Sequence, residues 1–394
     1  MSYNFDEIIP REGTDCVKYD LRSAFFKSKD VIPMWVADMD FRTPDFIMEA
    51  IKQRINHPIL GYSILSDSFY QSIINWMKNR HRWEIKREWI TISPGIVPAL
   101  AFCLDAFTKP GDKIIVQTPV YHPFFLVPKD LGRQVVENPL KLEGNRYYFD
   151  FDDLERKIDN RTRILFLSNP HNPVGRVWTK DELERIGEIC LKHNIIILSD
   201  EIHSDLIFKN HRHIPLASIS ESLAQITITA MSPSKTFNLA GMHTAELIIP
   251  NPKLLREYNL VINNLHLTSG NLLGNIALEA AYTYGANWLD QMMDYMQGNV
   301  DVIHSFIKEN LPMIRAFELE GTYLLWLDFR NLNLKQSDLN ELMIKKAKIG
   351  LNDGAMFGTG GVGFQRMNIA CPQSILVKAL NQLKEAIKPN EKLN

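Results

Sequence analysis

Residues 163–200 read "RILFLSNPHNPVGRVWTKDELERIGEICLKHNIIILSD". The stretch begins and nearly ends with short apolar runs, at 163–168 and 195–199, each of a length typical of a strand. Their hydrophobicity is continuous rather than alternating, which indicates strands buried on both faces. Between them, 179–193 has Thr179 as a helix N-cap, Glu182 three residues later and apolar residues on one helical face. This strand–helix–strand unit predicts an α/β fold with a largely parallel sheet.

The rest of the chain extends this pattern and then departs from it. Further apolar runs of strand length lie at 114–118, 226–230 and 246–249. After about residue 287, long helical patterns at 288–309, 336–348 and 373–388 surround one strand-like run at 321–329. We therefore expect an N-terminal arm with part of a small domain at 1–54, a large domain at 55–287 and a smaller α+β domain at 288–394. The first 50 residues, including "PMWVADMDF" at 33–41, predict an extended arm.

The composition excludes several classes of protein. The 394 residues carry a net charge of −2, so no strong attraction to nucleic acid or to an anionic membrane is expected. No signal-peptide pattern opens the sequence, and no apolar run approaches the ~20 residues of a membrane helix. We expect a cytoplasmic protein without nucleic-acid or membrane partners. The four cysteines are far apart, which argues against a disulfide framework or a zinc knot.

His211 and His213 form an H-x-H pair that could ligate a metal. No carboxylate or thiol lies at ligand spacing from them, so we interpret the pair as part of a solvated polar loop before Pro215. We predict no metal site.

Polar or aromatic side chains follow each predicted strand. The segments concerned are "PVYHPFF" after 114–118, "NPHNPVGR" after 163–168, "DEIHSD" after 195–199 and "MSPSKTF" after 226–230. Ligand sites of open α/β sheets lie at the carboxyl ends of the strands. We therefore expect these four segments to converge on one pocket.

Two charges in these segments stand next to apolar strands. Asp200 and Lys235 each lose hydration there unless a partner compensates. They could form a structural ion pair with each other, or each could have its own partner on a ligand. A glycine-containing loop, "SPGIVPA" at 93–99, precedes a helical segment whose free N–H groups could bind phosphate.

Other motifs give weaker indications. The phosphate loop G-x-x-x-x-G-K-[ST] is absent, and "GTGGVG" at 358–363 is in the wrong place for a dinucleotide fingerprint. Ser232 and Lys235 match the S-x-x-K signature of serine acyl-enzymes, although its companions S-D-N and K-T-G are missing. A serine acyl-enzyme stays a competing hypothesis.

Taken in order, the motifs resemble one known family. The set "SPGIVPAL", "TPVYHPFF", "NPHNPVGR", "SDEIHSDL" and "SPSKTFNLAG" resembles fold-type I pyridoxal-phosphate enzymes of the class I/II aminotransferase superfamily. "PMWVADMDF", "EGTYLLWLDFR" and "FQRMNIACP" resemble its cystathionine β-lyase (cysteine-S-conjugate β-lyase) branch of bacterial C–S lyases. The resemblance covers about residues 15–388. It implies a large domain with a mostly parallel sheet flanked by helices, and a smaller α+β domain.

The resemblance assigns roles to the residues of the pocket. Lys235 resembles the lysine that bonds to the aldehyde of pyridoxal 5′-phosphate and then acts as the base for the Cα proton, since burial lowers a lysine pKa. Asp200 resembles the acid that pairs with the pyridine nitrogen. Tyr121 would stack on the ring and contribute to catalysis, and Asn172 would hydrogen-bond the ring 3′-oxygen.

The remaining roles concern the phosphate and the substrate. Arg366, with Asn172, would bind the substrate α-carboxylate. The phosphate would contact Gly95, Ile96, Val97, Ser232 and Ser234, and Tyr62 of a neighbouring subunit, which implies a homodimer with shared active sites. Two positions depart from the aminotransferase pattern. His203 stands where a tyrosine is usual and would bind the cofactor by contacting the ring 3′-oxygen, and His243 stands where a phosphate-binding arginine is usual.

The resemblance implies a carbon–sulfur β-lyase acting on a small amino-acid thioether. L-Cystathionine would give homocysteine, pyruvate and ammonia, a reaction of methionine biosynthesis. Two alternatives stay open. An aminotransferase shares the lysine base and the acid, and no single side chain separates the two reactions. A regulatory binding protein that retains lyase activity is the other.

Overall fold

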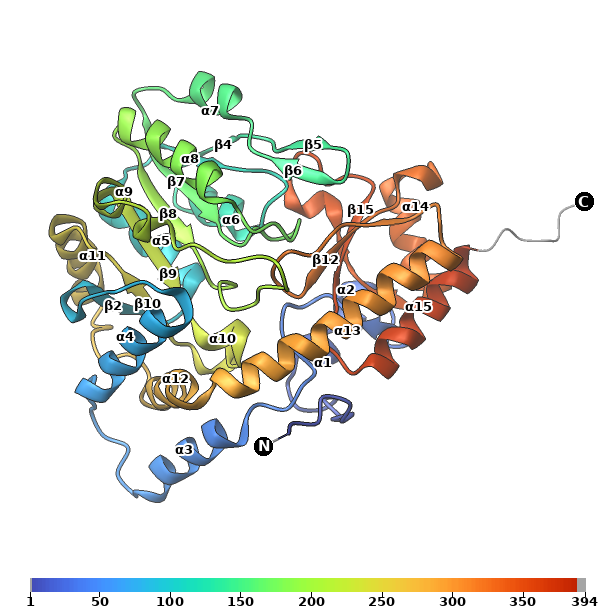
Figure 1. Cartoon of the computed structure of the whole chain (residues 1–394), viewed down its shortest axis with the longest axis horizontal. Coiled ribbons are helices and arrows are strands. Elements are labelled where there is room, and N and C mark those ends of the chain that lie inside the picture. Colours follow the sequence, from blue (N-terminus) through green and yellow to red (C-terminus); the bar gives the residue numbers. More distant parts are fainter. Residues whose placement is uncertain (1, 388–394) are drawn as a thin grey trace, which may run out of the picture.

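The computed structural model describes residues 2–387, and its centre is a seven-stranded sheet (Figure 1). In spatial order the strands are β2 (Ile90–Ser93), β10 (Ala245–Ile248), β9 (Thr227–Met231), β8 (Ile196–Asp200), β7 (Thr162–Ser168), β3 (Lys113–Val116) and β4 (Gln134–Glu137). Strand β10 is antiparallel to both neighbours, and the pairs from β9 to β4 are parallel. The predicted α/β fold is confirmed, and β2 and β4 are strands that the sequence did not indicate.

The predicted strand–helix–strand unit consists of β7, α8 (Lys180–Lys192) and β8. Thr179 is the N-cap of α8, its hydroxyl accepts from the Glu182 N–H, and the Glu182 carboxylate accepts from the Thr179 N–H. This capping box was predicted and is confirmed. The apolar face of α8, including Leu183 and Ile186, packs in the core on one face of the sheet.

Helices cover both faces of the sheet, which explains why the strands are apolar throughout. Alternate residues of β3 show this, because Ile115 packs in one hydrophobic core while Ile114 and Val116 pack in the other. The helices and outer hairpin of this region are α4 (Asp67–His81), α5 (Ile96–Phe107), α6 (Pro123–Asp130), β5 (Lys141–Glu143), β6 (Arg146–Tyr148), α7 (Phe151–Lys157), α9 (Glu221–Ile226), α10 (Pro233–Thr236), α11 (Pro252–Asn264) and α12 (Leu272–Tyr284).

The C-terminal part is built on a second, antiparallel sheet. Its strands, in spatial order, are β11 (Arg315–Ala316), β12 (Leu324–Asp328), β15 (Phe364–Asn368) and β14 (Asn352–Asp353). The helices are α13 (Ala286–Asn310), α14 (Gln336–Glu341) and α15 (Gln373–Ile387). Helix α13 runs from the side of α12 to this sheet (Figure 1). Beyond Glu341 the predicted helix at 336–348 continues as a π-helix, Leu342–Ala347. The predicted helix at 373–388 corresponds to α15, and its last predicted residue, 388, lies outside the described residues.

The N-terminal segment is more structured than the predicted extended arm. It forms α1 (Val17–Asp20), α2 (Arg22–Phe26), strand β1 (Ile32–Pro33) and α3 (Asp45–Asn56). Strand β1 pairs in parallel with β13 (Ile349–Gly350) of the C-terminal part. Only Ile47 and Ile51 of α3 are buried, so its apolar pattern was too short to indicate a helix.

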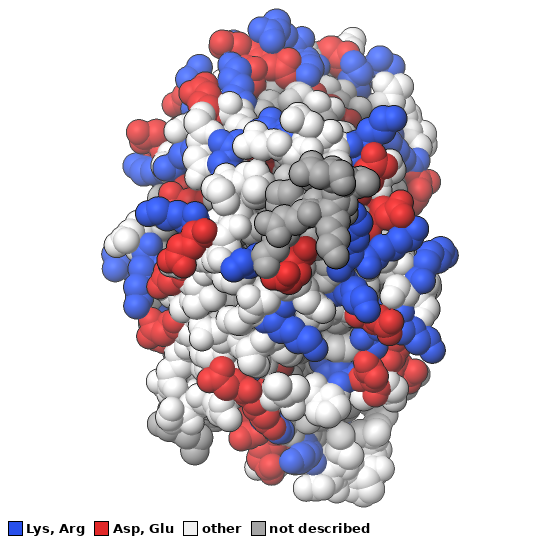
Figure 2. All heavy atoms as spheres, turned by 90° about the vertical axis from the view of Figure 1, so that its right-hand side faces the viewer, with Lys and Arg blue, Asp and Glu red and all other residues white. Residues whose placement is uncertain are grey.

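On the face of the molecule shown in Figure 2, acidic and basic side chains are interspersed. None of the helices in the described part of the chain is long and apolar enough to cross a membrane. The four cysteines are all free thiols.

Candidate active site

The predicted convergence of the strand ends is confirmed by the register of the sheet. Ser168 of β7 lies opposite Asp200 of β8, and Asp200 lies opposite Ala230 of β9. At the same edge, antiparallel β10 joins the ends of β2 and β9 through the pairs Ala245–Ser93 and Glu246–Met231. Strand β3 is parallel to β7, with Val116 opposite Phe166, so its end lies at this edge too. The loops after β3, β7, β8 and β9, and also the loop after β2, therefore leave one edge of the sheet together.

A cavity of about 510 Å³ is open at this edge, a size typical of sites for small molecules. Three of the predicted site residues line it: Lys235, Tyr121 and Arg366. Its other walls come from both ends of the chain and include Phe25, Phe26, Trp35, Val36, Ala37, Met343, Ile344, Asn352, Asp353 and Met356. The cavity is therefore formed jointly by the N-terminal segment, the large sheet and the C-terminal part.

Lys235 lies in α10, the short helix that follows β9. Its Nζ donates to the Ala37 carbonyl oxygen at 2.6 Å. Burial lowers the pKa of Lys235 to about 8, an effect that the negative charge of Asp38 partly opposes. A substantial fraction of the amine is therefore neutral near physiological pH.

Ser232 is the N-cap of the same helix. Its hydroxyl donates to the Thr244 carbonyl at 2.7 Å and accepts from the Ser234 N–H. The Lys235 amine has another partner, so the S-x-x-K pair does not form the serine–lysine hydrogen bond that a serine acyl-enzyme requires.

Asp200 ends β8 and is 6% exposed. Its carboxylate accepts one hydrogen bond, from the Ile202 N–H at 3.2 Å, and burial raises its pKa to about 7. Within residues 2–387, Asp200 and Lys235 make no ion pair with each other or with another side chain. The hypothesis of a structural ion pair is wrong, and each group is available to a ligand.

Arg366 of β15 is a buried cation without an anion. One guanidinium nitrogen donates to the Asn172 Oδ1 at 3.0 Å, and the other donates to the Trp35 carbonyl at 3.0 Å and the Asn352 Oδ1 at 2.6 Å. No carboxylate of the described chain pairs with it, and burial lowers its pKa to about 10. Such a group is suited to bind a carboxylate that enters from the cavity.

The other predicted residues are distributed around this centre. Tyr121 and Asn172 lie in adjacent loops, because the Tyr121 N–H donates to the Asn172 carbonyl at 3.1 Å. His203 is buried, and burial holds its pKa well below the usual range, so the ring is neutral. Its ring packs edge-on against Tyr323.

The predicted phosphate contacts lie at the start of α5 and α10. Gly95 is the N-cap of α5 and no side chain caps the helix, so the N–H groups of Ile96 and Val97 are free for an anion. Ser234 is partly buried beside Ser232. By contrast, Tyr62 is fully exposed and lies outside the cavity of its own chain.

The sequence did not single out several residues of the cavity. His122 and Asn352 line it, and the Tyr323 hydroxyl donates to the same Ala37 carbonyl as Lys235, at 3.0 Å. His122 and Tyr323 lie in quoted stretches, "PVYHPFF" and "EGTYLLWLDFR", but neither residue received a role of its own, and the stretch 33–41 was interpreted as an arm.

The interpretation of the H-x-H pair is wrong for one of its two residues. His213 is 4% exposed, and its Nε2 lies 2.8 Å from a carboxylate oxygen of buried Glu201. His211 is only partly exposed and lies 3.6 Å from Glu318. The pattern did not reveal Glu201 as a partner because the two residues are brought together by the turn after β8. No group of three His, Cys, Asp or Glu side chains within residues 2–387 could hold a metal ion.

Comparison with known proteins gives consistent results. Residues 29–383 match the family described as aminotransferase class I and II. The chain is 41% identical to cystathionine beta-lyase PatB of Bacillus subtilis over 98% of its own length and 100% of that protein. It superposes on a PLP-bound putative aminotransferase from Clostridium difficile with a TM-score of 0.96 and 44% identity, covering 98% and 100% of the two chains. It superposes on a PLP-bound C-S lyase from Staphylococcus hominis with a TM-score of 0.92 and 32% identity, covering 99% of each chain.

Proposed function

The chain belongs to the aminotransferase class I and II family and is a pyridoxal-phosphate-dependent carbon–sulfur β-lyase, and we propose that it cleaves L-cystathionine or related S-conjugates of cysteine. The observation that carries the proposal is a set of three charged groups: Lys235 and Arg366, which line the cavity, and Asp200, which is buried at the end of the neighbouring strand β8. Within the described residues, Lys235, Asp200 and Arg366 form no ion pair with one another or with any other side chain.

These residues fit pyridoxal phosphate and an amino-acid substrate. Asp200 would hold the pyridine nitrogen, whose proton would keep the buried carboxylate ionised. The free N–H groups at the start of α5 and the hydroxyl of Ser234 would contact the phosphate. When bound, the cofactor supplies an electron sink for negative charge at the substrate Cα.

Lys235 would bond to the cofactor aldehyde in the resting enzyme and act as the base once the substrate amine has replaced it. Its pKa of about 8 is close to physiological pH, which suits a group that must both take up and give back a proton. The proton would be removed from Cα, and the bond between Cβ and sulfur would then break. The thiolate would leave, and hydrolysis of the remaining fragment would yield pyruvate and ammonia.

Arg366 and Asn172 would orient the substrate through its α-carboxylate. The guanidinium is already held by Asn172 and by the Trp35 carbonyl, so little reorganisation is needed when the carboxylate binds. A carboxylate would also supply the negative charge that this buried cation lacks.

The group attached to sulfur would occupy the outer part of the cavity. The cavity walls combine apolar side chains, such as the exposed Phe25, with Asp353, whose carboxylate accepts from Gln336, Asn340 and the Ala355 N–H. The S-substituent of cystathionine is a carbon chain that ends in an ammonium and a carboxylate, and its chain and its ammonium are complementary to the apolar wall and to Asp353.

We also propose that the active enzyme is a homodimer. Large apolar side chains are exposed in one segment of the chain: Ile55, Ile59, Leu60, Tyr62 and Ile64. A second copy of the chain would cover this segment and bring Tyr62 to the phosphate of its neighbour, a role that one chain alone does not provide.

The test is a product assay with the purified holoenzyme and L-cystathionine. We expect equal amounts of pyruvate and free thiol, and borohydride should fix the cofactor onto the peptide that contains Lys235. Transfer of the amino group to a 2-oxo acid without pyruvate would instead identify an aminotransferase. Absence of pyruvate from every cysteine S-conjugate tried would refute the proposal.

A further inference from the structure

The loop at 35–39, "WVADM", is held by hydrogen bonds to each of its successive backbone carbonyls. The donors to these carbonyls are Arg366 on Trp35, Asn368 on Val36, Lys235 and Tyr323 on Ala37, Asn368 and Lys18 on Asp38, and Arg11 and Asn238 on Met39. The same short loop therefore contacts the catalytic lysine, the carboxylate-binding arginine and the N-terminal segment.

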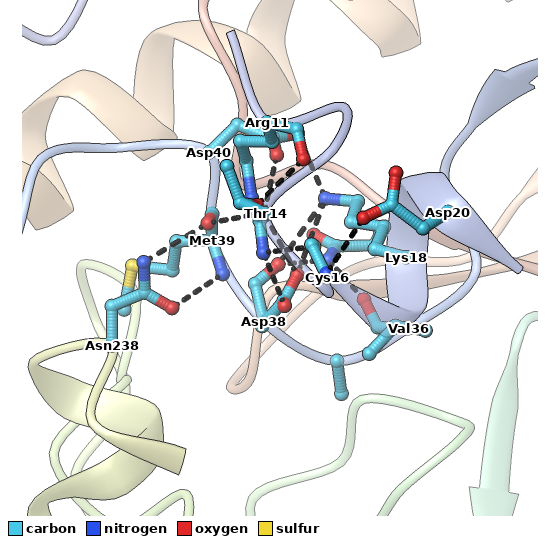
Figure 3. Close-up of polar contacts among 12 residues, drawn as sticks. Arg11, Thr14, Cys16, Lys18, Asp20, Val36, Asp38, Met39, Asp40 and Asn238 are labelled. Carbon is cyan, nitrogen blue, oxygen red and sulfur yellow. Dashed lines mark hydrogen bonds and ion pairs between the residues drawn. The ribbon is translucent and has the colours of Figure 1, made fainter. Parts of the chain in front are cut away.

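Four charges fix this loop from its outer side, and we call them the arm clamp: Arg11, Lys18, Asp38 and Asp40 (Figure 3). The Arg11 guanidinium donates to Asp38 and to Asp40, at 2.6 Å each. The Lys18 ammonium lies 2.8 Å from Asp40 and 3.7 Å from Asp38. The two carboxylates, two residues apart, are thereby shared between two cations that come from the first 20 residues.

The arm clamp is neutral as a set and is buried at its inner pair. Lys18 is 1% exposed and Asp40 is 6% exposed, so water does not replace a lost partner there, whereas Arg11 and Asp38 are each 18% exposed. Removing one member of a buried pair leaves an uncompensated charge, which favours rearrangement of the loop. The position of the loop therefore depends on all four side chains.

Asp38 and Ala37 connect the arm clamp to Lys235. The Ala37 carbonyl accepts from the Lys235 amine at 2.6 Å, and the charge of Asp38 acts on the same amine. The other charged or titratable groups that face Lys235 are Asp200, Arg366 and His203. Of the two carboxylates, Asp38 has the larger effect in raising the pKa of Lys235.

We propose that Arg11 and Lys18 are positioning residues of the active site, which hold the Ala37 carbonyl at the amine of Lys235 and fix the position of the neighbouring Asp38 carboxylate. This inference rests on the proposed function of Lys235. A neutral amine that donates one N–H to Ala37 has its lone pair directed away from that carbonyl and into the cavity. The nearby carboxylate favours the protonated nitrogen, whether Lys235 is free or bonded to the cofactor.

The experiment is a pH titration of the holoenzyme followed by the absorbance of the bound cofactor. This absorbance changes when the nitrogen that Lys235 contributes loses its proton, so the midpoint reports the charges around that nitrogen. Asp38→Asn keeps the shape of the side chain and removes its charge, and we expect the midpoint to fall by roughly one pH unit.

Arg11→Lys separates position from charge, because it conserves the charge but loses the fork that binds both carboxylates. If Arg11 positions Asp38, the midpoint should fall in the same direction, and kcat/KM should drop about tenfold or more. The matched control is Arg42→Lys, in an exposed pair with Glu7 on the same segment, which should change neither quantity.

Two results would overturn the inference. One is an unchanged midpoint in Asp38→Asn. The other is an Arg11→Lys enzyme that unfolds at a lower temperature but keeps the parental midpoint and kcat/KM, since that would show a purely structural role. Because the titration needs only bound cofactor, it remains informative even if the enzyme does not cleave carbon–sulfur bonds.

Discussion

Two groups of charged side chains lie close together in this molecule: those of one group are paired with opposite charges, and those of the other are not. In the arm clamp, each cation contacts two carboxylates, and the set is neutral. Arg366 and the half-buried Lys235 line the cavity, and Asp200 lies at the end of β8. None of the three has an ionic partner in the described chain, although Asp200 and Arg366 are 6% and 5% exposed. Burial costs free energy in both cases, but only the arm clamp compensates it within the chain. The difference indicates that unpaired buried charges mark where ligands bind, whereas paired ones hold the backbone.

The largest expected effect is that of Lys235→Ala. Removal of the base should lower the rate of pyruvate formation from cystathionine by about 10³-fold or more. Circular dichroism should stay unchanged, because no ion pair of the chain is broken. Borohydride should no longer fix the cofactor to the protein. A variant that retains a tenth of the activity would contradict the role of Lys235.

Lys18→Met tests the other side of the comparison. It leaves Asp40 buried without its lysine, so the free energy of unfolding should fall by about 3–5 kcal/mol in urea titrations. The double variant Lys18→Met/Asp40→Asn should recover part of this loss. Arg42→Gln, which breaks an exposed pair, should cost less than about 1 kcal/mol. Equal losses in Lys18→Met and Arg42→Gln would remove the distinction drawn here.

Arg366→Gln should lower catalytic efficiency more than it lowers the free energy of unfolding. It removes a cation that has no anion in the chain, so the loss of unfolding free energy should be smaller than for Lys18→Met. The kcat/KM for cystathionine should drop by about 10²-fold, mainly through KM, because the substrate carboxylate loses a charge-assisted pair. Steady-state kinetics beside urea titrations would measure both. A large loss of unfolding free energy with an unchanged KM would show that Arg366 stabilises the fold and does not bind the substrate carboxylate.

The smallest expected effect is that of Asp200→Asn on the stability of the cofactor-free protein. It should appear as a change in how the free energy of unfolding depends on pH. The folded-state pKa of about 7 lies above the ordinary value of 3.8, so the folded protein binds the proton more tightly than the unfolded chain. The contribution of Asp200 to stability is therefore most favourable at low pH and is lost as pH rises toward 7. The variant should gain roughly 2 kcal/mol over the parent between pH 5 and pH 8. A difference independent of pH would contradict the raised pKa.

The large sheet could be predicted because its signals are local. The apolar runs that became β3, β7, β8, β9 and β10 each lie within one or two residues of the observed strands, and the capping box of α8 is confirmed. Strands β2 and β4 were missed because Ile90–Ser93 and Gln134–Glu137 contain polar residues among their apolar ones and adjoin further polar residues. The convergence of four loops followed from the rule for strand ends, and the register of the sheet confirms it.

The contribution of the N-terminal segment to the cavity could not be predicted in the same way. Arg11 and Lys18 come together with Asp38 and Asp40 through tertiary folding, and no local period relates them. The same is true of His213, whose buried partner Glu201 is 12 residues away across a turn. Long-range pairing of polar groups leaves no pattern in a single sequence, whereas periodic apolar residues do.

The pairing of β1 with β13 has a consequence for the order of folding during synthesis. Ile32 lies beside Ile349, so the C-terminal part includes a strand from near the start of the chain. The ribosome releases the two partners at opposite ends of translation, and the first strand must wait unpaired while the large sheet is made. A nascent chain arrested before residue 349 would leave β1 unpaired and open to chaperones and proteases, and the pair can form only after residue 349 has left the ribosome.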